Sequence, residues 1–282
     1  MSGATLAHVS DPHFGAHDPA VAHALAGALR EARPDLVLVG GDFTQRARHG
    51  QYAAARAWLE RVGLPYLATP GNHDIPLYDV LRRMRDPYGR YRAHVAPELD
   101  GEWSAPGALV AAVCTASPRR RVEGRVEPIQ VERLAATLAE PEEPCARVLL
   151  THHPLVTPPG QRERSFHGRE ELLEAAAAGG ADLLLSGHRH VAHTGAWLHT
   201  TPSGREMVAL WEPTACSSRL RGEANGFATI GVDADRIEIT PWRLAGERFA
   251  PGPARAWARS GDGWAEAGEA AQAAASPGPL AR

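Results

Sequence analysis

The chain has 282 residues, of which 44% are hydrophobic and 22% charged, so it can bury a large core, and one substantial α/β domain is favoured over two full domains. Its 30 Lys and Arg residues against 33 Asp and Glu residues give a formal net charge of −3, which excludes a global electrostatic attraction to nucleic acid or to an anionic membrane. No apolar run approaches the roughly 20 residues of a membrane-spanning helix, so no membrane span is expected.

The cysteines and the N-terminal residues favour a cytoplasmic protein. Cys114, Cys145 and Cys216 are widely spaced and lie outside any Cys-x-x-Cys pattern, which argues against a disulfide framework or a thiolate zinc site. The first residues lack the basic region and the long apolar core of a signal peptide. We therefore expect a reducing compartment.

Short apolar runs alternate with helical patterns along most of the chain. Runs bounded by Gly, Pro, Asp or Ser predict buried strands over residues 5–9, 36–39, 64–68, 108–113, 147–150 and 183–185. Helical patterns lie between them over residues 18–32, 51–62, 128–138 and 170–178. Strand-like runs over residues 206–211, 227–232 and 236–240 have no helix between them, which predicts antiparallel pairing that completes a sheet.

The domain is expected to span residues 1–249. From about residue 250 onward Pro, Gly and Ala dominate, so residues 250–282 are predicted to form a weakly ordered C-terminal tail with a short helix near residues 264–274.

Five polar motifs follow predicted strands, at the point where each strand ends. They are Asp11-Pro12-His13, Gly41-Asp42, Gly71-Asn72-His73-Asp74, Thr151-His152-His153-Pro154 and Gly187-His188-Arg189-His190. Because the first three motifs are about 30 residues apart, the length of a strand-helix-strand unit, parallel strands would bring them to one edge of a sheet. Alone, Asp-x-His and Gly-Asp are equally typical of a helix cap or an Asx turn.

The motifs together predict a pair of metal ions. The candidate ligands are Asp11, His13, Asp42, Asn72, His152, His188 and His190. They offer nitrogen and oxygen atoms and no sulfur, a mixture that suits Fe, Mn, Zn or Co. Such a set exceeds the four ligands that a tetrahedral zinc ion accepts, whereas two ions about 3.5–4 Å apart that share one carboxylate use all of them.

The motifs, in this order, resemble the signature of the calcineurin-like metallophosphoesterase superfamily, which runs D-x-H, G-D, G-N-H-[DE], a His after a strand, and G-H-x-H. The resemblance covers residues 11–190 and implies a four-layer α/β sandwich of two mixed β-sheets flanked by helices. It also implies two divalent or trivalent transition-metal ions. By the resemblance, one ion is held by Asp11, His13, Asp42 and His190, and the other by Asn72, His152 and His188, with Asp42 bridging them.

The resemblance further implies a role for residues beside the ligands. It makes His73 a catalytic residue that is oriented by Asp74, and it places Asn72, His73 and His153 at the substrate. The implied activity is hydrolysis of a phosphate ester by a hydroxide that bridges the two metals, because two cations lower the pKa of a bound water and bind the phosphoryl oxygens.

Residues 10–15 and 151–154 look most like those of bacterial phosphodiesterases, so the expected substrate is a small phosphodiester rather than nucleic acid. Two alternatives are a phosphomonoesterase or pyrophosphatase acting on a nucleotide or lipid-sugar, and a non-catalytic scaffold. A scaffold of this fold typically loses metal ligands or His73, and this chain keeps both.

Some basic residues are open to two interpretations. Gln45 stands where many such phosphodiesterases have an acidic residue, and Arg46, Arg48 and His49 after it either reach an anionic substrate or begin the next helix in solvent. The Arg-rich residues 82–92 suit either a cap that lines the cleft or a surface helix with a basic face.

Overall fold

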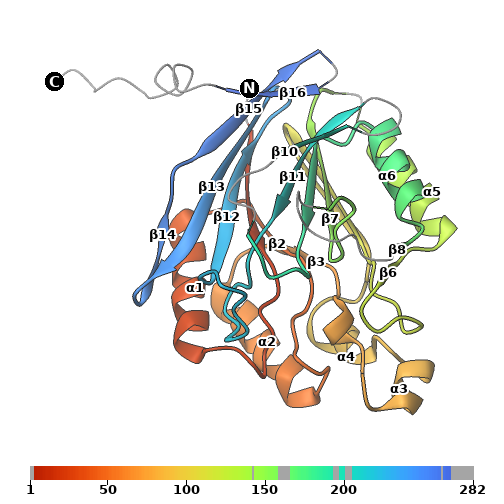
Figure 1. Ribbon diagram of the computed structural model, residues 1–282, viewed down its shortest axis with the longest axis vertical. Helices are drawn as coiled ribbons and strands as arrows, with labels where there is room; N and C mark the ends of the chain where they lie inside the picture. The colour runs from red at the N-terminus through yellow and green to blue at the C-terminus, as the bar shows by residue number, and fades with distance from the viewer. Residues whose placement is uncertain are drawn as a thin grey trace.

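Two mixed β-sheets pack face to face, and helices cover the outer face of each sheet, in the computed structural model of the protein (Figure 1). The structure describes residues 3–141, 143–157, 166–192, 197–200, 205–261 and 263–267. One apolar cluster lies between the first sheet and its helices, a second lies between the two sheets, and a third lies between the second sheet and its helices. The layers therefore run helix, sheet, sheet, helix, which confirms the four-layer arrangement implied by the sequence.

The first sheet joins strands from both ends of the chain. Its order is β16 (Gly263–Glu266), β15 (Arg255–Ser260), β13 (Arg236–Ala245), β12 (Gly226–Val232), β1 (Ala4–Val9), β2 (Leu36–Val39) and β3 (Tyr66–Ala68), and β14 (Arg248–Pro251) pairs with β13. β1, β2 and β3 are parallel, β12 pairs antiparallel with β1, and β13 pairs antiparallel with β12. The antiparallel pairing predicted for residues 227–232 and 236–240 is confirmed.

The second sheet is built around parallel strands. Its order is β10 (Trp197–Thr200), β11 (Glu206–Trp211), β9 (Leu183–Ser186), β7 (Ala146–Thr151), β5 (Ala108–Val113) and β4 (Gly101–Ala105). Strands β5, β7, β9 and β11 are parallel, so the antiparallel pairing predicted for residues 206–211 does not hold between β11 and β9. The antiparallel partner of β11 is the edge strand β10. Strands β6 (Gly124–Arg125) and β8 (Phe166–His167) form a separate short pair.

The four helices predicted between residues 18 and 178 are confirmed. They are α1 (Pro19–Ala32) and α2 (His49–Val62) on the first sheet, and α5 (Pro128–Ala139) and α6 (Arg169–Ala178) on the second. The α1 helix begins here because Oδ1 of Asp18 accepts a hydrogen bond from the backbone N–H of Ala20 at 2.8 Å, and Pro19 suits the first helical position. The α2 helix ends at Gly63, whose left-handed φ of 64° favours glycine.

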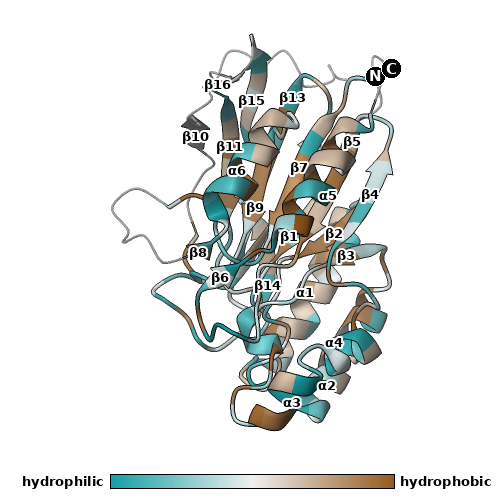
Figure 2. Cartoon of the chain, turned by 90° about the vertical axis from the view of Figure 1, so that its right-hand side faces the viewer, coloured by the Kyte–Doolittle hydropathy of each residue, from teal (hydrophilic) through white to brown (hydrophobic). Residues whose placement is uncertain are grey.

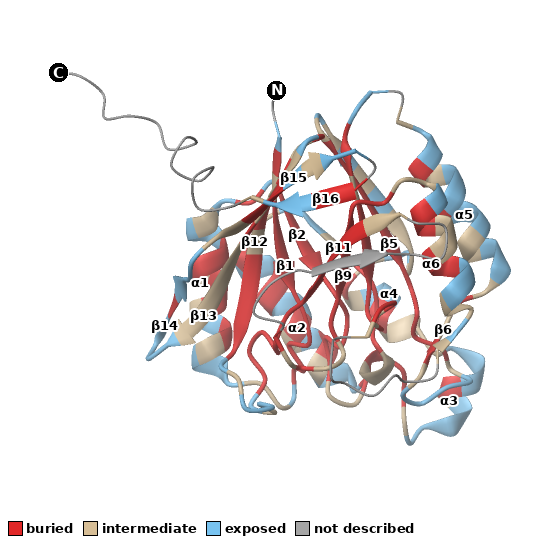
Figure 3. Ribbon diagram, turned by 45° about the horizontal axis from the view of Figure 1, so that its top comes forward, coloured by how far each residue is buried: buried red, intermediate tan, exposed pale blue. Residues whose placement is uncertain are grey.

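Strand β1 is buried on both faces, as a central parallel strand must be. Leu6 packs between the two sheets with Leu38 and Val148, whereas Ala7 and Val9 face the helices. The parallel strands of both sheets end at the same edge, and Figure 3 shows buried residues continuing from the strands into the loops that follow them. This burial fixes the loops that carry the polar motifs.

The first sheet continues beyond the predicted domain boundary at residue 249. Strands β14, β15 and β16 extend the first sheet, and Trp257 and Trp264 are buried in the core between the sheets. Trp264 lies in a strand rather than in the predicted short helix. The Pro-, Gly- and Ala-rich composition of this segment predicted weak order. The burial of the two tryptophan side chains nevertheless stabilises strands here. Residues 268–282 lie outside the described residues.

The Arg-rich residues 82–92 fold as two short helices, α3 (Val80–Arg85) and α4 (Gly89–His94). Arg83 is buried and donates hydrogen bonds to the carbonyl groups of Pro76 at 3.0 Å and Pro118 at 2.8 Å, so it fixes the loop after β5 instead of presenting its charge to a cleft. Part of α3 has the colour of hydrophobic residues in Figure 2, and the side chains of Val80, Leu81 and Met84 are exposed.

Cys114, Cys145 and Cys216 are buried and unpaired. None of the described helices combines the length and hydrophobicity that crossing a bilayer requires.

A buried carboxylate ties the C-terminal strands to the second sheet. Oδ1 of Asp182, just before β9, accepts hydrogen bonds from Arg205 at 3.0 Å, Arg259 at 3.1 Å and the indole N–H of Trp264 at 3.2 Å. Its other oxygen accepts from the backbone N–H of Arg147 at 2.9 Å. Because this carboxylate is fully buried and forms ion pairs with two arginines, removing it takes a buried negative charge away from both of them.

We expect Asp182→Ala to lower the free energy of unfolding by about 3 kcal/mol, because two arginines and an indole N–H lose their buried carboxylate partner. The matched control is Glu266→Gln, which breaks the exposed pair between Arg255 and Glu266 and should cost at most about 1 kcal/mol. Urea unfolding followed by circular dichroism measures both. Equal effects of the two substitutions would contradict the role given to Asp182.

Candidate metal centre

The predicted ligands meet at the edge where the parallel strands end. Asp11 and His13 follow β1, Asp42 follows β2, and the short 3-10 helix Asn72–Asp74 follows β3. His152 follows β7 in the second sheet, and His188 and His190 follow β9. Residues from both sheets thus face one another across the end of the sandwich.

Four of these side chains form a first group of donor atoms. Ligand atoms of Asp11, His13, Asp42 and His190 all lie within 4.8 Å of one another, and all four residues are buried. The Nε2 atoms of His13 and His190 are 2.9 Å apart, and Oδ1 of Asp11 lies 3.2 Å from Nε2 of His190. Oδ1 of Asp11 has no well-aligned hydrogen-bond donor among the described residues. Buried nitrogen and oxygen atoms that face one point in this way are what a cation needs.

A second group converges on Asn72. Its Oδ1 atom lies 3.2 Å from Nε2 of His152 and 3.1 Å from Nδ1 of His188. Asp42 joins the two groups, because its Oδ2 atom is 3.5 Å from Nε2 of His13 and its Oδ1 atom is 3.5 Å from Nε2 of His152. One carboxylate therefore presents one oxygen to each group, the arrangement expected of a bridging ligand. The donor set fits two transition-metal ions and contains no sulfur.

The backbone at the site is held in an unusual conformation. Left-handed φ angles occur at Asp11 (53°), His13 (49°), Asp42 (54°), His188 (69°) and His190 (55°). Each such residue costs of order 1–2 kcal/mol, and strain of this kind persists where function requires it. The surrounding core therefore supports a loop geometry that aims these side chains inward.

Glycines in two motifs leave room for the ligands. A Cβ atom on Gly187 would meet Oγ of Ser10 and Oδ2 of Asp11, and a Cβ atom on Gly71 would meet the carboxylate of Asp42. Any larger residue would displace these carboxylates, which explains why glycine precedes His188 and Asn72.

Burial and charge set the protonation states of the ligands. Burial alone would raise the pKa of Asp11, but the imidazoles of His190 and His152 outweigh it and hold this pKa well below its usual range. Burial lowers the pKa of His13 to about 3. The carboxylate is thus ionised and His13 neutral at neutral pH, the states in which each binds a metal.

Hydrogen bonds around the ligands fix their orientation. Nδ1 of His152 lies 2.7 Å from the carbonyl of Gly40, so it carries the proton and Nε2 keeps its lone pair for a metal. Oγ of Ser10 donates to Oδ2 of Asp11 at 2.6 Å, and the backbone N–H of His188 donates to the same oxygen at 2.9 Å. Ser10 was not among the predicted site residues, although it directly precedes Asp11, and a backbone carbonyl such as that of Gly40 leaves no signal in a sequence.

His73 lies beside the first group, and its ring packs edge-on against that of His13 at 4.9 Å between centroids. Its Nδ1 atom is 2.9 Å from the carbonyl of Gln45. The carboxylate of Asp74 accepts instead from the backbone N–H groups of Phe43 at 3.0 Å and Thr44 at 2.8 Å. This corrects the expectation that Asp74 orients His73: Asp74 shapes the loop after β2, and Gln45 in that loop orients the imidazole.

The expectation that His153 contacts the substrate is also corrected. Its Nδ1 atom is 2.8 Å from Oγ1 of Thr115, and its Nε2 atom is 3.0 Å from the carbonyl of Val122, so both ring nitrogens are used inside the protein. Burial and the neighbouring His152 lower its pKa to about 3, which keeps the ring neutral. The ring packs against that of His188 at 4.6 Å, so His153 supports a ligand and has no nitrogen left for a substrate.

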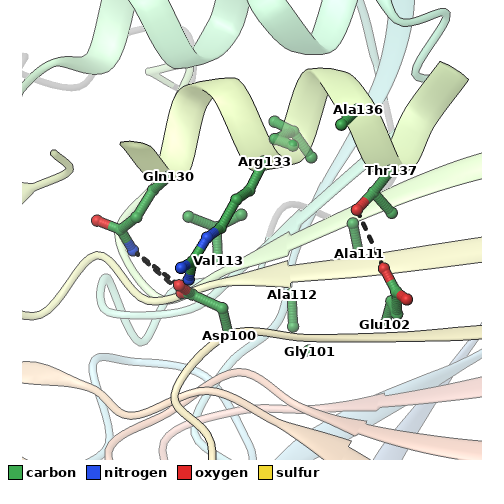
Figure 4. Close-up of a pocket in the computed structure, with 11 residues that line it drawn as sticks. Asp100, Gly101, Glu102, Ala111, Ala112, Val113, Gln130, Arg133, Ala136 and Thr137 are labelled. Atoms are coloured by element: carbon green, nitrogen blue, oxygen red, sulfur yellow. Dashed lines mark hydrogen bonds between the residues drawn. The ribbon is translucent and has the colours of Figure 1, made fainter. Parts of the chain in front are cut away.

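A pocket of about 450 Å³ lies away from this centre, between α5 and strands β4 and β5 (Figure 4). Its acidic groups already have partners. Asp100 accepts from Nε2 of Gln130 at 3.0 Å, and Glu102 accepts from Oγ1 of Thr137 at 3.0 Å. The polar groups of this pocket are therefore less available to a reacting substrate than the side chains of the candidate metal centre.

We expect Gly187→Ala to lower metal affinity by about 10–100-fold, because its methyl group would displace Ser10 and Asp11. Titration of the metal-free protein with Zn²⁺ or Mn²⁺ in a calorimeter measures this. The control is Gly27→Ala in α1, where an added methyl group has no atom within 4 Å. An unchanged affinity in the first variant would show that the glycine is not needed for the site.

Comparison with known proteins gives relatives of one kind. A probable cyclic nucleotide phosphodiesterase of Synechococcus sp. is 31% identical over 174 residues, which cover 61% of this chain and 64% of that protein. The glycerophosphodiester phosphodiesterase GpdQ of Enterobacter lignolyticus is 40% identical over 85 residues, which cover 24% of this chain and 29% of that protein. The matched part thus spans less than two thirds of the length of each relative.

Solved structures share the fold. A structure of PhoD aligns with a TM-score of 0.73 at 13% identity, covering 95% of this chain and 72% of that one. The purple acid phosphatase PPD1 of yellow lupin (Lupinus luteus) aligns with a TM-score of 0.69 at 13% identity, covering 92% of this chain and 54% of that one. Residues 4–192, more than half of the chain, match the model of the calcineurin-like phosphoesterase family. The chain belongs to the calcineurin-like phosphoesterase family.

Proposed function

We propose that the protein is a metal-dependent phosphodiesterase that hydrolyses a small phosphodiester with the aid of two bound transition-metal ions, drawn from Fe, Mn, Zn and Co. The observation that carries the proposal is the position of Asp42, whose two carboxylate oxygens each face a separate group of donor atoms. The names of the two curated relatives, both phosphodiesterases, support the diester as substrate.

When bound, the two ions would supply positive charge for the phosphoryl oxygens and activate a water molecule as the nucleophile. The chain's residues set the charge of the site. Only Asp11 and Asp42 among the ligands are carboxylates, and Asn72 provides an oxygen without charge, so two divalent ions leave the site positive. A site of this sign attracts an anionic phosphodiester.

His73 is positioned to act on the substrate. Because Nδ1 donates to the carbonyl of Gln45, Nε2 is the nitrogen left to bind a phosphoryl oxygen or to donate a proton to the departing alkoxide. The amide nitrogen of Asn72 lies 3.1 Å from the carbonyl of Arg121. This contact orients the side chain so that its amide oxygen faces the other candidate ligands. We place both residues at the substrate, with Asp74 stabilising the loop behind them.

The diesterase proposal is tested by comparing two chromogenic substrates on protein reconstituted with Mn²⁺ or Zn²⁺. Bis(p-nitrophenyl) phosphate should be cleaved with a higher kcat/KM than p-nitrophenyl phosphate. Asp42→Asn should lower kcat/KM by about 1000-fold, because the shared charge is lost. Faster cleavage of the monoester would favour the phosphomonoesterase alternative, and an inactive metal-loaded protein would favour the scaffold.

A second experiment separates His73 from the metal ligands. His73→Asn should lower kcat by about 100- to 10,000-fold, the range for loss of a general acid or base, while the metal content stays at that of the wild type. His23→Asn on the outer surface of α1 is the control and should change neither quantity. Loss of metal in the His73 variant would show instead that His73 stabilises the metal centre.

A further inference from the structure

Gln45 brings together two arginines from distant parts of the chain, beside His73. Its backbone carbonyl accepts a hydrogen bond from Nη1 of Arg46 at 2.9 Å, and that nitrogen lies 3.2 Å from Nδ1 of His73. Its side-chain oxygen accepts from Nη1 of Arg219 at 3.2 Å. The backbone of Arg219 lies against the metal centre, with its carbonyl 3.5 Å from Nδ1 of His190. Two guanidinium groups thus flank the same residue at the side of the site where His73 lies.

The charges of these two arginines are not balanced by a carboxylate. Within the described ranges, neither Arg46 nor Arg219 forms an ion pair, whereas other partly buried arginines do, as Arg243 does with Glu212 at 2.8 Å. The oxygen atoms that Arg46 and Arg219 contact belong to the amide groups of Gln45, which are neutral. Both side chains remain partly exposed, so each has N–H groups left for a ligand.

Their chemistry suits an anionic group. A guanidinium remains charged and presents paired N–H donors that match a phosphate or carboxylate. The scissile phosphate is already accounted for by the convergent ligands and His73. A short spacer such as a ribose or a glycerol would place a second anion of the same substrate beside Arg46 and Arg219 while the scissile phosphate occupies the metal centre.

We propose that Arg46 and Arg219 form a subsite that selects phosphodiesters carrying a second phosphate or carboxylate group close to the scissile bond. This inference rests on the proposed phosphodiesterase function and narrows its substrate class. Gln45 holds the two guanidinium groups in place and, being neutral, leaves their charge available. The absence of charge on the Gln45 side chain therefore contributes to the proposed selectivity for a second anion.

The test uses two substrates that differ only in the second anion. They are thymidine 5′-(p-nitrophenyl phosphate) and the same compound with a 3′-phosphate, and release of p-nitrophenolate is followed for both. The metal-loaded wild type should have a kcat/KM about tenfold higher for the 3′-phosphorylated substrate, the size expected for a charge-assisted contact. This ratio, rather than either rate alone, reports on the subsite.

Two substitutions should bring the ratio close to one. Arg219→Gln removes one guanidinium, and Gln45→Glu keeps the shape of the side chain but places a negative charge between the two arginines. Arg221→Gln, two residues away in the same loop as Arg219, removes the same charge from an exposed side chain and should leave the ratio unchanged. Thermal melting of each variant checks that the fold is intact.

The outcomes distinguish this proposal from the proposed function. If the wild type cleaves bis(p-nitrophenyl) phosphate but shows a ratio near one, the subsite is refuted and the phosphodiesterase stands. A ratio that persists in Arg219→Gln and Gln45→Glu, or falls equally in Arg221→Gln, also refutes the subsite. If neither thymidine ester nor bis(p-nitrophenyl) phosphate is cleaved, the phosphodiesterase function fails and takes the subsite with it.

Discussion

The carboxylate of Asp42 lies between two groups of donor atoms, and this position organises the rest of the site. Each of its oxygens is 3.5 Å from an imidazole nitrogen of a different group, His13 on one side and His152 on the other. The backbone N–H of His73 donates to the same carboxylate at 2.8 Å. One side chain thereby links β2 of the first sheet with a loop of the second sheet and with the proposed catalytic histidine.

Such a concentration of buried polar groups is costly unless a cation compensates it. Asp11, His13, Asp42 and His190 are all buried, and Asp11, His13, Asp42, His188 and His190 adopt left-handed backbone angles. The fold tolerates these costs because the loops are anchored by the cores on both sides of each sheet. Strained ligand loops on a rigid scaffold hold donor atoms in place before any metal arrives, which is how a binding site gains affinity through preorganisation.

Much of the fold and the convergence of the candidate ligands was predictable because both depend on local patterns. The apolar runs of β2 and β5 and the capped helix α1 have clear signals, and the ligand motifs directly follow strands. The C-terminal strands were missed because Trp257 and Trp264 stand in a Pro- and Gly-rich composition, and only their long-range burial reveals them. The partners of His73 and His153 were not predictable either, since both involve backbone carbonyls, those of Gln45 and Val122. Side-chain chemistry is visible in a sequence, but the direction of a carbonyl depends on the folded loop.

The most direct test of the account is a crystal structure of the metal-loaded protein with anomalous scattering measured at the absorption edge of the metal. We predict two anomalous peaks, one on each side of the Asp42 carboxylate, the first beside His13 and His190 and the second beside Asn72, His152 and His188. A single peak, or peaks that do not share Asp42, would contradict the central claim that one carboxylate bridges two ions.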